Sequence, residues 1–174
     1  MLQSLGLHFD AIEDRLLLRL ADGALETPGI DLLLTRRVCA ALRGELQQLA
    51  DASAQAPERL DAVAKATVSA IHHQALASQV SMRREPAKAA GPRSPPQLVT
   101  GVTCGRRRGD GKWVVRFELR DQPTVTLTLS DQTLHGLIDL LRRQIVNAGW
   151  ALPAIPADTP PDERGKKTAA QQFH

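Results

Sequence analysis

The sequence predicts an α+β fold made of a duplicated β-β-β-α unit, with an antiparallel sheet or sheets and helices packed on one face. Short runs of alternating apolar and polar residues indicate strands, and two apolar stripes at helical spacing indicate amphipathic helices. Residues 30–49 and 125–144 repeat one pattern, a strand, a hydroxyl residue and a helix, at an offset of about 95 residues. In this repeat Thr35 corresponds to Ser130, and the apolar strand positions correspond as well.

The first copy begins with two strands that form a hairpin. We expect strands at residues 5–11, 15–21 and 29–34 and a helix over residues 36–52. Asp22-Gly23 is typical of a tight turn, and Thr35 is a good N-cap for the helix. A second, alanine-rich helix is predicted from Pro57, in its first turn, to about Arg84.

The second copy follows the same order. We expect strands at residues 98–104, 112–121 and 124–129, the last of which alternates threonine with valine and leucine. Ser130 is predicted to cap the final helix, and Gly149 to end it as the C′ residue. Trp113 and Phe117 are expected on the core side of their strand.

These elements divide the chain into four parts. Residues 1–84 hold the first copy and the extra long helix, and residues 85–97 form a linker rich in proline, alanine and basic residues. Residues 98–150 hold the second copy, and residues 151–174 are expected to be a disordered tail. The pattern leaves open whether the six strands form one continuous sheet or two sheets related by a pseudo-twofold.

Composition points to a small cytoplasmic protein with local basicity. The 174 residues contain 43% hydrophobic residues, enough for one core, and two cysteines without a spacing motif. We find no apolar run of membrane length and no leader pattern, so we expect a cytoplasmic protein that does not contact a membrane. The formal net charge is +3, but residues 83–112 carry eight basic and two acidic side chains.

Catalytic signatures are sparse, so we expect no enzymatic activity, no cofactor and no metal. His72 and His73 are neighbours on a helix and point about 100° apart, which favours a solvated or partly packed pair over a metal site. The acidic group at Asp10, Glu13 and Asp14 lies in an expected exposed turn. An enzymatic alternative would need a cleft that brings together His8, His135 or this acidic group.

The best candidate for binding is a basic loop with the exposed face of the strand beside it. The cationic residues of this candidate site are Arg106, Arg107, Arg108, Lys112, Arg116 and Arg120. They could bind phosphates or an acidic protein partner, or form a solvated loop, and the sequence leaves these alternatives open. In the tail, Trp150 and Phe173 are candidate anchors for a partner, with Trp150 and Leu152 as a possible tether at its start.

The duplicated unit with basic residues on its sheet resembles, in topology, the Whirly fold, and the resemblance implies binding of single-stranded nucleic acid. The residues themselves favour a non-enzymatic binding protein, an adaptor or assembly subunit of a larger complex. The alternative is a regulator that binds single-stranded DNA or RNA through residues 106–108 and the outer sheet face. We expect another protein or self-association as the main partner, with the helix at 57–84 packed on the other helices or against a second subunit.

Overall fold

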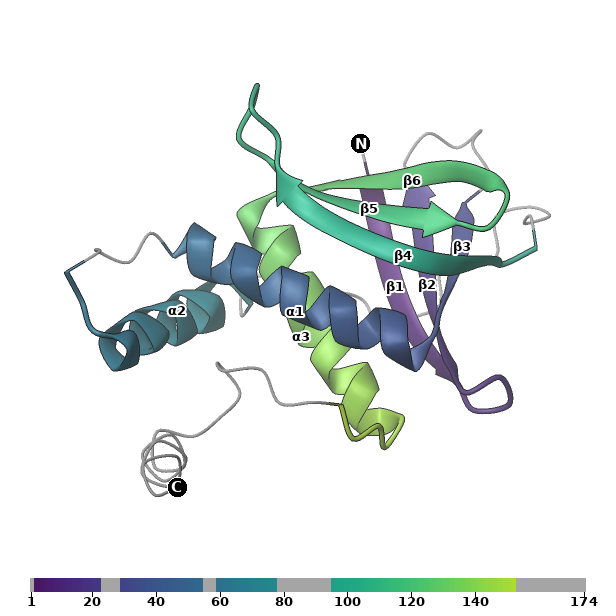
Figure 1. The fold of residues 1–174 in the computed structure, drawn as a ribbon, viewed down its shortest axis with the longest axis horizontal. Helices are drawn as coiled ribbons and strands as arrows, with labels where there is room; N and C mark the ends of the chain where they lie inside the picture. Colours follow the sequence, from purple (N-terminus) through teal and green to yellow (C-terminus); the bar gives the residue numbers. More distant parts are fainter. Residues whose placement is uncertain (1, 23–28, 55–58, 78–94, 153–174) are drawn as a thin grey trace, which may run out of the picture.

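The α+β prediction is confirmed by a computed structural model, which describes residues 2–22, 29–54, 59–77 and 95–152 (Figure 1). Six strands form one mixed sheet in the order β1-β2-β3-β4-β5-β6. The strands are β1 (Leu2–Asp10), β2 (Arg15–Asp22), β3 (Ile30–Leu34), β4 (Gln97–Arg106), β5 (Trp113–Leu119) and β6 (Gln122–Leu129). The helices are α1 (Arg36–Ser53), α2 (Ala62–Ala77) and α3 (Asp131–Asn147).

The sheet is continuous but not wholly antiparallel, which corrects the prediction. β3 pairs with β4 in parallel, through Leu32 opposite Gln97 and Leu33 opposite Leu98, and the other strand pairs are antiparallel. A twofold axis at this seam would pair equivalent strands of the two copies. Instead, the third strand of the first copy (β3) pairs with the first strand of the second copy (β4). The order β-β-β-α occurs twice along the chain, but the duplication itself stays a prediction.

Both predicted helix caps are present. The hydroxyl of Thr35 accepts a hydrogen bond from the N–H of Val38, and the hydroxyl of Ser130 accepts one from the N–H of Thr133. Gly149 has φ +65°, a left-handed conformation that suits glycine at the end of α3.

Helix α2 begins later than predicted. Its first residue is Ala62, and the Asp61 side chain accepts a hydrogen bond from the N–H of Ala64 at 2.7 Å, which makes Asp61 the N-cap. The predicted start at Pro57 and the predicted end near Arg84 lie outside the described residues, as does most of the predicted linker.

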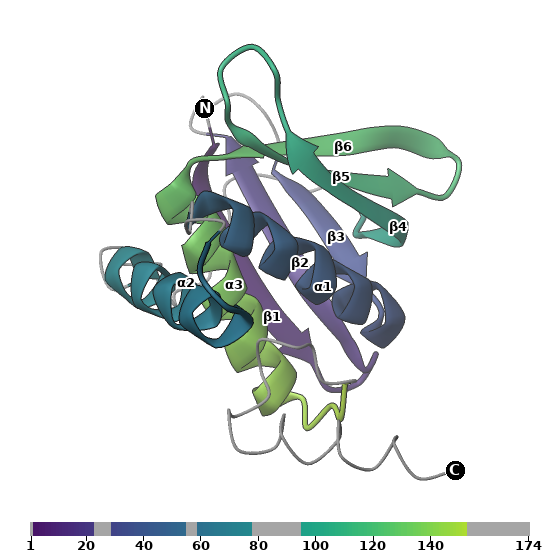
Figure 2. The same cartoon turned by 60° about the vertical axis from the view of Figure 1, so that its left-hand side comes forward.

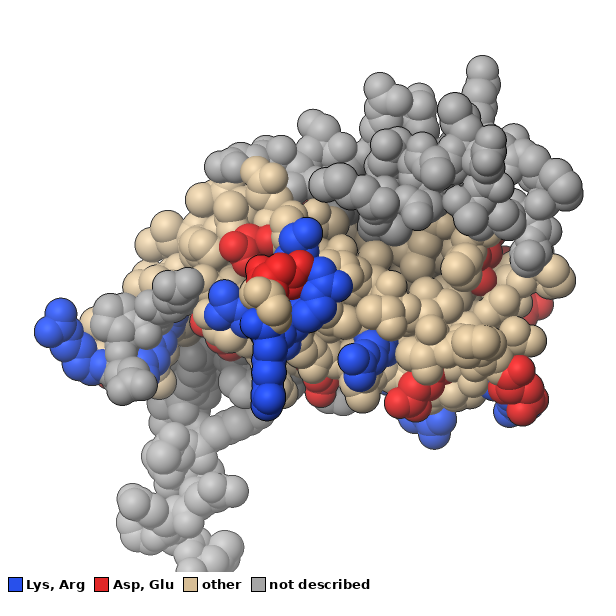
Figure 3. Space-filling model, turned by 90° about the horizontal axis from the view of Figure 1, so that it is seen from above, with Lys and Arg blue, Asp and Glu red and all other residues tan. Residues whose placement is uncertain are grey.

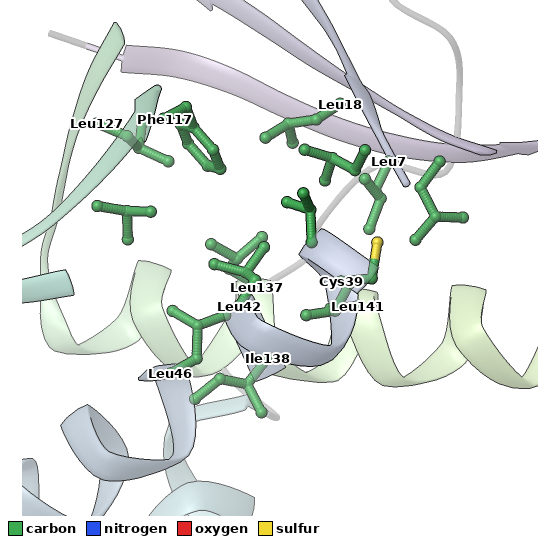
Figure 4. Packing of buried hydrophobic residues seen from close by; sticks show 14 of the residues in the cluster. Leu7, Leu18, Cys39, Leu42, Leu46, Phe117, Leu127, Leu137, Ile138 and Leu141 are labelled. Atoms are coloured by element: carbon green, nitrogen blue, oxygen red, sulfur yellow. The ribbon is translucent and has the colours of Figure 1, made fainter. Parts of the chain in front are cut away.

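Helices α1 and α3 fill the concave side of a sharply bent sheet. β4, β5 and β6 cross over the direction of β1, β2 and β3, and α2 lies outside α3, away from the sheet (Figures 1 and 2). Leucines from both halves of the sheet meet the helices in a single core, around the fully buried ring of Phe117 (Figure 4). Trp113 is also buried, so both aromatic residues point inward, as predicted.

Two indole hydrogen bonds hold the ends of α3. At its start, Nε1 of Trp113 on β5 donates to Oδ1 of Asp131 at 2.5 Å. Just beyond its end, Nε1 of Trp150 donates to Oδ1 of Asp14 in the β1–β2 turn at 2.8 Å, and the Trp150 ring packs edge-on against Phe9. One bond comes from each half of the sheet, so α3 ties the two halves together.

The described helices include none that is long and apolar enough to cross a membrane.

Replacing Trp150 by phenylalanine tests this anchoring. Trp150→Phe keeps a ring against Phe9 but removes the donor to Asp14, so we expect the free energy of unfolding to fall by about 1–2 kcal/mol. Asp14→Asn, which keeps an acceptor oxygen and tolerates the positive φ of this position, should cost less. Urea unfolding monitored by circular dichroism measures both; equal losses for the two variants would contradict the anchoring role.

Candidate functional site

The predicted basic loop forms the turn of a hairpin between β4 and β5, and it protrudes from the sheet (Figures 1 and 2). Nε of Arg106 donates to the carbonyl oxygen of Gly111 at 2.9 Å, and its guanidinium lies 5.3 Å from the centre of the Trp113 ring. Gly111 has φ +67°, and a β-carbon there would lie 3.2 Å from the Arg106 guanidinium, so this position favours glycine.

Arg107 is paired within the same hairpin. Its guanidinium donates twice to the carboxylate of Asp110, once from Nε at 2.8 Å, and Nζ of Lys112 lies 3.8 Å from the same carboxylate. These hydrogen bonds and charges hold the pKa of Asp110 well below its usual range. Arg108 is exposed at the tip. The hairpin is therefore an ordered turn whose positive charge is partly neutralised.

The structure does not gather all six predicted cations into one patch. Arg116 lies in the middle of β5, where the exposed row across the sheet runs from Thr103 to Arg116 to Thr126. Arg120 lies in the turn at the far end of β5, about 20 Å from the hairpin. Figure 3, which looks down on this face, shows Lys and Arg side chains with acidic side chains among them.

The predicted tail anchors have different outcomes. Trp150 is 6% exposed, and its ring and N–H are engaged within the chain, as described above. Leu152 packs against the core, in agreement with a tether at this point. Phe173 lies outside the described residues, and partner binding by the tail stays a prediction.

Sequence reasoning missed a partly buried series of hydrogen bonds through two histidines between the three helices. Nδ1 of His73 on α2 lies 2.8 Å from Nδ1 of His135 on α3, and Nε2 of His135 lies 3.0 Å from the hydroxyl oxygen of Ser53 at the end of α1. The His135 side chain is fully buried, and the His72 ring packs edge-on against it. The pair His72 and His73 is thus partly packed, one of the predicted possibilities.

The hydrogen-bond partners determine where the protons lie. The single hydroxyl proton of Ser53 is donated to the carbonyl oxygen of Ala50 at 2.8 Å, so Ser53 accepts from Nε2–H of His135. A neutral His135 then has a lone pair on Nδ1, which accepts from Nδ1–H of His73. The Ser53 hydroxyl proton is thus held in a structural hydrogen bond to the Ala50 carbonyl oxygen, and the hydroxyl does not donate it to a base such as His135.

Both histidines favour the neutral form. Burial lowers the pKa of His135 to about 4, with smaller contributions from His73 and His72, while Asp131 acts in the opposite direction. Burial and the charge of Arg142 lower the pKa of His73, and Asp139 opposes them. In a further contact between α2 and α1, the Ser69 hydroxyl donates to the Asp51 carboxylate at 2.7 Å.

The groups named for an enzymatic alternative do not converge. His8 is exposed on β1, opposite the helix-covered face, and Asp10 accepts two backbone N–H bonds in the β1–β2 turn. His135 is buried among the helices. Within the described ranges, no group of three or more His, Cys, Asp or Glu side chains could hold a metal ion.

The outer face of α2 is exposed and carries two large apolar side chains among small or uncharged polar ones. Val63 is 55% exposed and Ile71 64% exposed, and Thr67, Ala70 and Gln74 on the same face are exposed too. The opposite face carries Ser69, His72 and His73 toward α1 and α3. The sequence indicated an apolar side that drifts around this helix, but it did not indicate which face is left outside.

Comparison of the chain with protein-family models, with curated proteins and with solved structures gives no match. The likeness to the Whirly fold therefore stays an expectation from topology.

Folding stability should depend on pH through His135. The unfolded chain takes up a proton as the pH falls through about 6.5, whereas folded His135 resists protonation until about 4. The free energy of unfolding therefore has the full contribution of neutral His135 above pH 6.5. Between pH 6.5 and 4 it falls by an amount on the order of 2 kcal/mol.

His135→Leu should flatten the dependence of the unfolding free energy on pH in this window. His8→Ala, which removes an exposed histidine on β1, should leave it in place. Urea titrations at several pH values measure the effect, and an unchanged slope in His135→Leu would rule out this assignment.

Proposed function

We propose that this chain is a non-enzymatic binding protein of the cytoplasm, an adaptor or assembly subunit, that docks a partner protein on the outer face of α2. In this proposal the two β-β-β-α segments form a duplicated scaffold. The segments differ in their additional elements, which are α2 in the first and the basic hairpin in the second. These additional elements are then the binding surfaces.

Two exposed apolar side chains on the outer face of α2, Val63 and Ile71, support this proposal. Large apolar side chains that are exposed to water favour association, because burying them against a partner removes their surface from water. Val63 and Ile71 are more than half exposed, on one side of a helix whose other side is already packed. Each side chain would contribute about 1–2 kcal/mol if a partner buried it.

The spacing on this face fits an amphipathic helix as the partner. Val63, Thr67, Ala70 and Gln74 follow one another at intervals of four, three and four residues, the spacing of a helix–helix seam. None of them is charged, and Ala70 is small enough to allow close approach of a second helix. The expected partner segment is therefore a helix with an apolar stripe of the same period.

Charged substitutions on α2 test this function. We expect Ile71→Glu and Val63→Glu to lose a partner that the wild-type chain captures, because each buries an unpaired carboxylate in the interface. Ile12→Glu is the matched control, since Ile12 is 95% exposed in the β1–β2 turn. Affinity capture with mass spectrometry compares the four chains; a partner set that is identical in all of them would contradict the proposal.

A nucleic-acid-binding regulator remains the second candidate, because the hairpin with Arg106, Arg107 and Arg108 protrudes from the sheet. Phosphates could contact the exposed Arg108, and the row of Thr103, Arg116 and Thr126 extends the polar surface. Base stacking has less support, because the Trp113 ring is buried beneath Arg106 and Phe117 is fully buried.

Counterion release tests the second candidate. If Arg108 contacts phosphate, Arg108→Ala should reduce the slope of log affinity against log salt by about 0.7 for single strands. Arg143→Ala removes a cation that is 73% exposed on α3 and should leave the slope unchanged. Fluorescence anisotropy with labelled oligonucleotides measures both, and a wild-type chain without salt-sensitive binding would eliminate this candidate.

A further inference from the structure

We infer that two copies of this chain pair edge to edge through antiparallel β6 strands. This inference does not depend on the proposed function of α2, which lies on the other side of the helical layer (Figure 2). It follows from the position of β6 in the sheet, from the absence of charged residues in this strand, and from the complementarity of its sequence to itself.

Strand β6 is an edge strand. It pairs with β5 on one side, in regular register from Val125 to Leu129, and none of the other described strands pairs with its second side. The backbone N–H and C=O groups on that side of an edge strand form a template for a further strand.

The two edges of the sheet differ in the charge that the edge strand carries. Natural edge strands are shielded by charges, bulges or covering elements. Both edge pairs include a register shift and both edge strands are contacted by α3, so these features do not distinguish them, but β1 carries Asp10 at its end. From residue 122 to residue 130 the chain has no charged residue, and Pro123 lies only at the start of β6. Alternating threonine, valine and leucine there favour strand pairing.

The sequence of β6 is complementary to itself in one antiparallel register. With Thr126 on the twofold axis, Thr124 lies opposite Thr128 of the second copy, and Val125 lies opposite Leu127 of the second copy. All threonines then share the uncovered face, where their hydroxyls can bond across the strands. Val125, half-buried in the single chain and packed against the core, gains an apolar neighbour on the helix side.

Charge does not oppose this pairing. The nearest cation on the uncovered face is Arg116, directly beside Thr126 on β5. The two copies of Arg116 would lie three strand spacings apart, about 14 Å, which exceeds the Debye length of about 8 Å at physiological salt. A second copy therefore meets an uncharged edge with the same hydrogen-bonding pattern as its own.

Two lysine substitutions in the same cross-strand row test the interface. Thr126→Lys places two ammonium groups opposite each other at the twofold axis, so we expect dimerisation to weaken about tenfold or more. Thr103→Lys adds the same charge beside the same Arg116, on β4 in the interior of the sheet, and should leave the dimer intact. Sedimentation equilibrium of the full chain measures the association constants.

Amide hydrogen exchange of the wild-type chain supplies a second measurement that requires no variant. We expect the outward amides of β6 to lose protection on dilution, while those of β1 do not change. A wild-type chain that is monomeric at every soluble concentration would overturn the inference. So would a Thr126→Lys chain that dimerises as well as Thr103→Lys.

Discussion

The position of α3 is the constraint on which the rest of the structure depends. The two halves of the sheet join at a short parallel seam between β3 and β4, which has only two register pairs. Helix α3 contacts β1, β6, α1 and α2, and so bridges both ends of the bent sheet. The indoles of Trp113 and Trp150 fix it by hydrogen bonds to carboxylates at its two ends. With so few aromatic residues, the chain uses both tryptophans for this one task.

The same helix explains why α2 is attached differently. Polar bonds are prominent in the contact of α2 with α1 and α3: Ser69 donates to Asp51, and His73 donates to His135. Such bonds need complementary partners and exclude sliding, but each contributes little net stability. The helix therefore holds a defined orientation while its apolar residues Val63 and Ile71 stay outside. If apolar packing alone set the orientation of α2, Val63 and Ile71 would face inward. The polar bonds therefore account for the exposure of these two side chains.

Local patterns predicted the parts of the fold that depend on nearby residues. Alternation located all six strands to within a few residues, and Thr35 and Ser130 were identified as caps because a cap depends on its own helix alone. The parallel seam and the contact between His73 and His135, 62 residues apart, depend on tertiary packing that no local pattern encodes. The six cations were grouped by closeness in sequence, whereas a strand separates Arg120 from the hairpin by its full length.

The two inferred surfaces have different geometry and do not compete. The β6 edge belongs to the sheet, whereas α2 lies beyond the helical layer, so a partner on α2 would not reach the second copy's strand (Figures 1 and 2). A pair joined through β6 would carry two identical α2 faces related by a twofold axis. A partner with two matching helices could then engage both faces, and the second contact would form at a high effective concentration. Small apolar surfaces such as the one around Ile71 can support stable assembly in this way, because the dimer offers two identical weak contacts that form together.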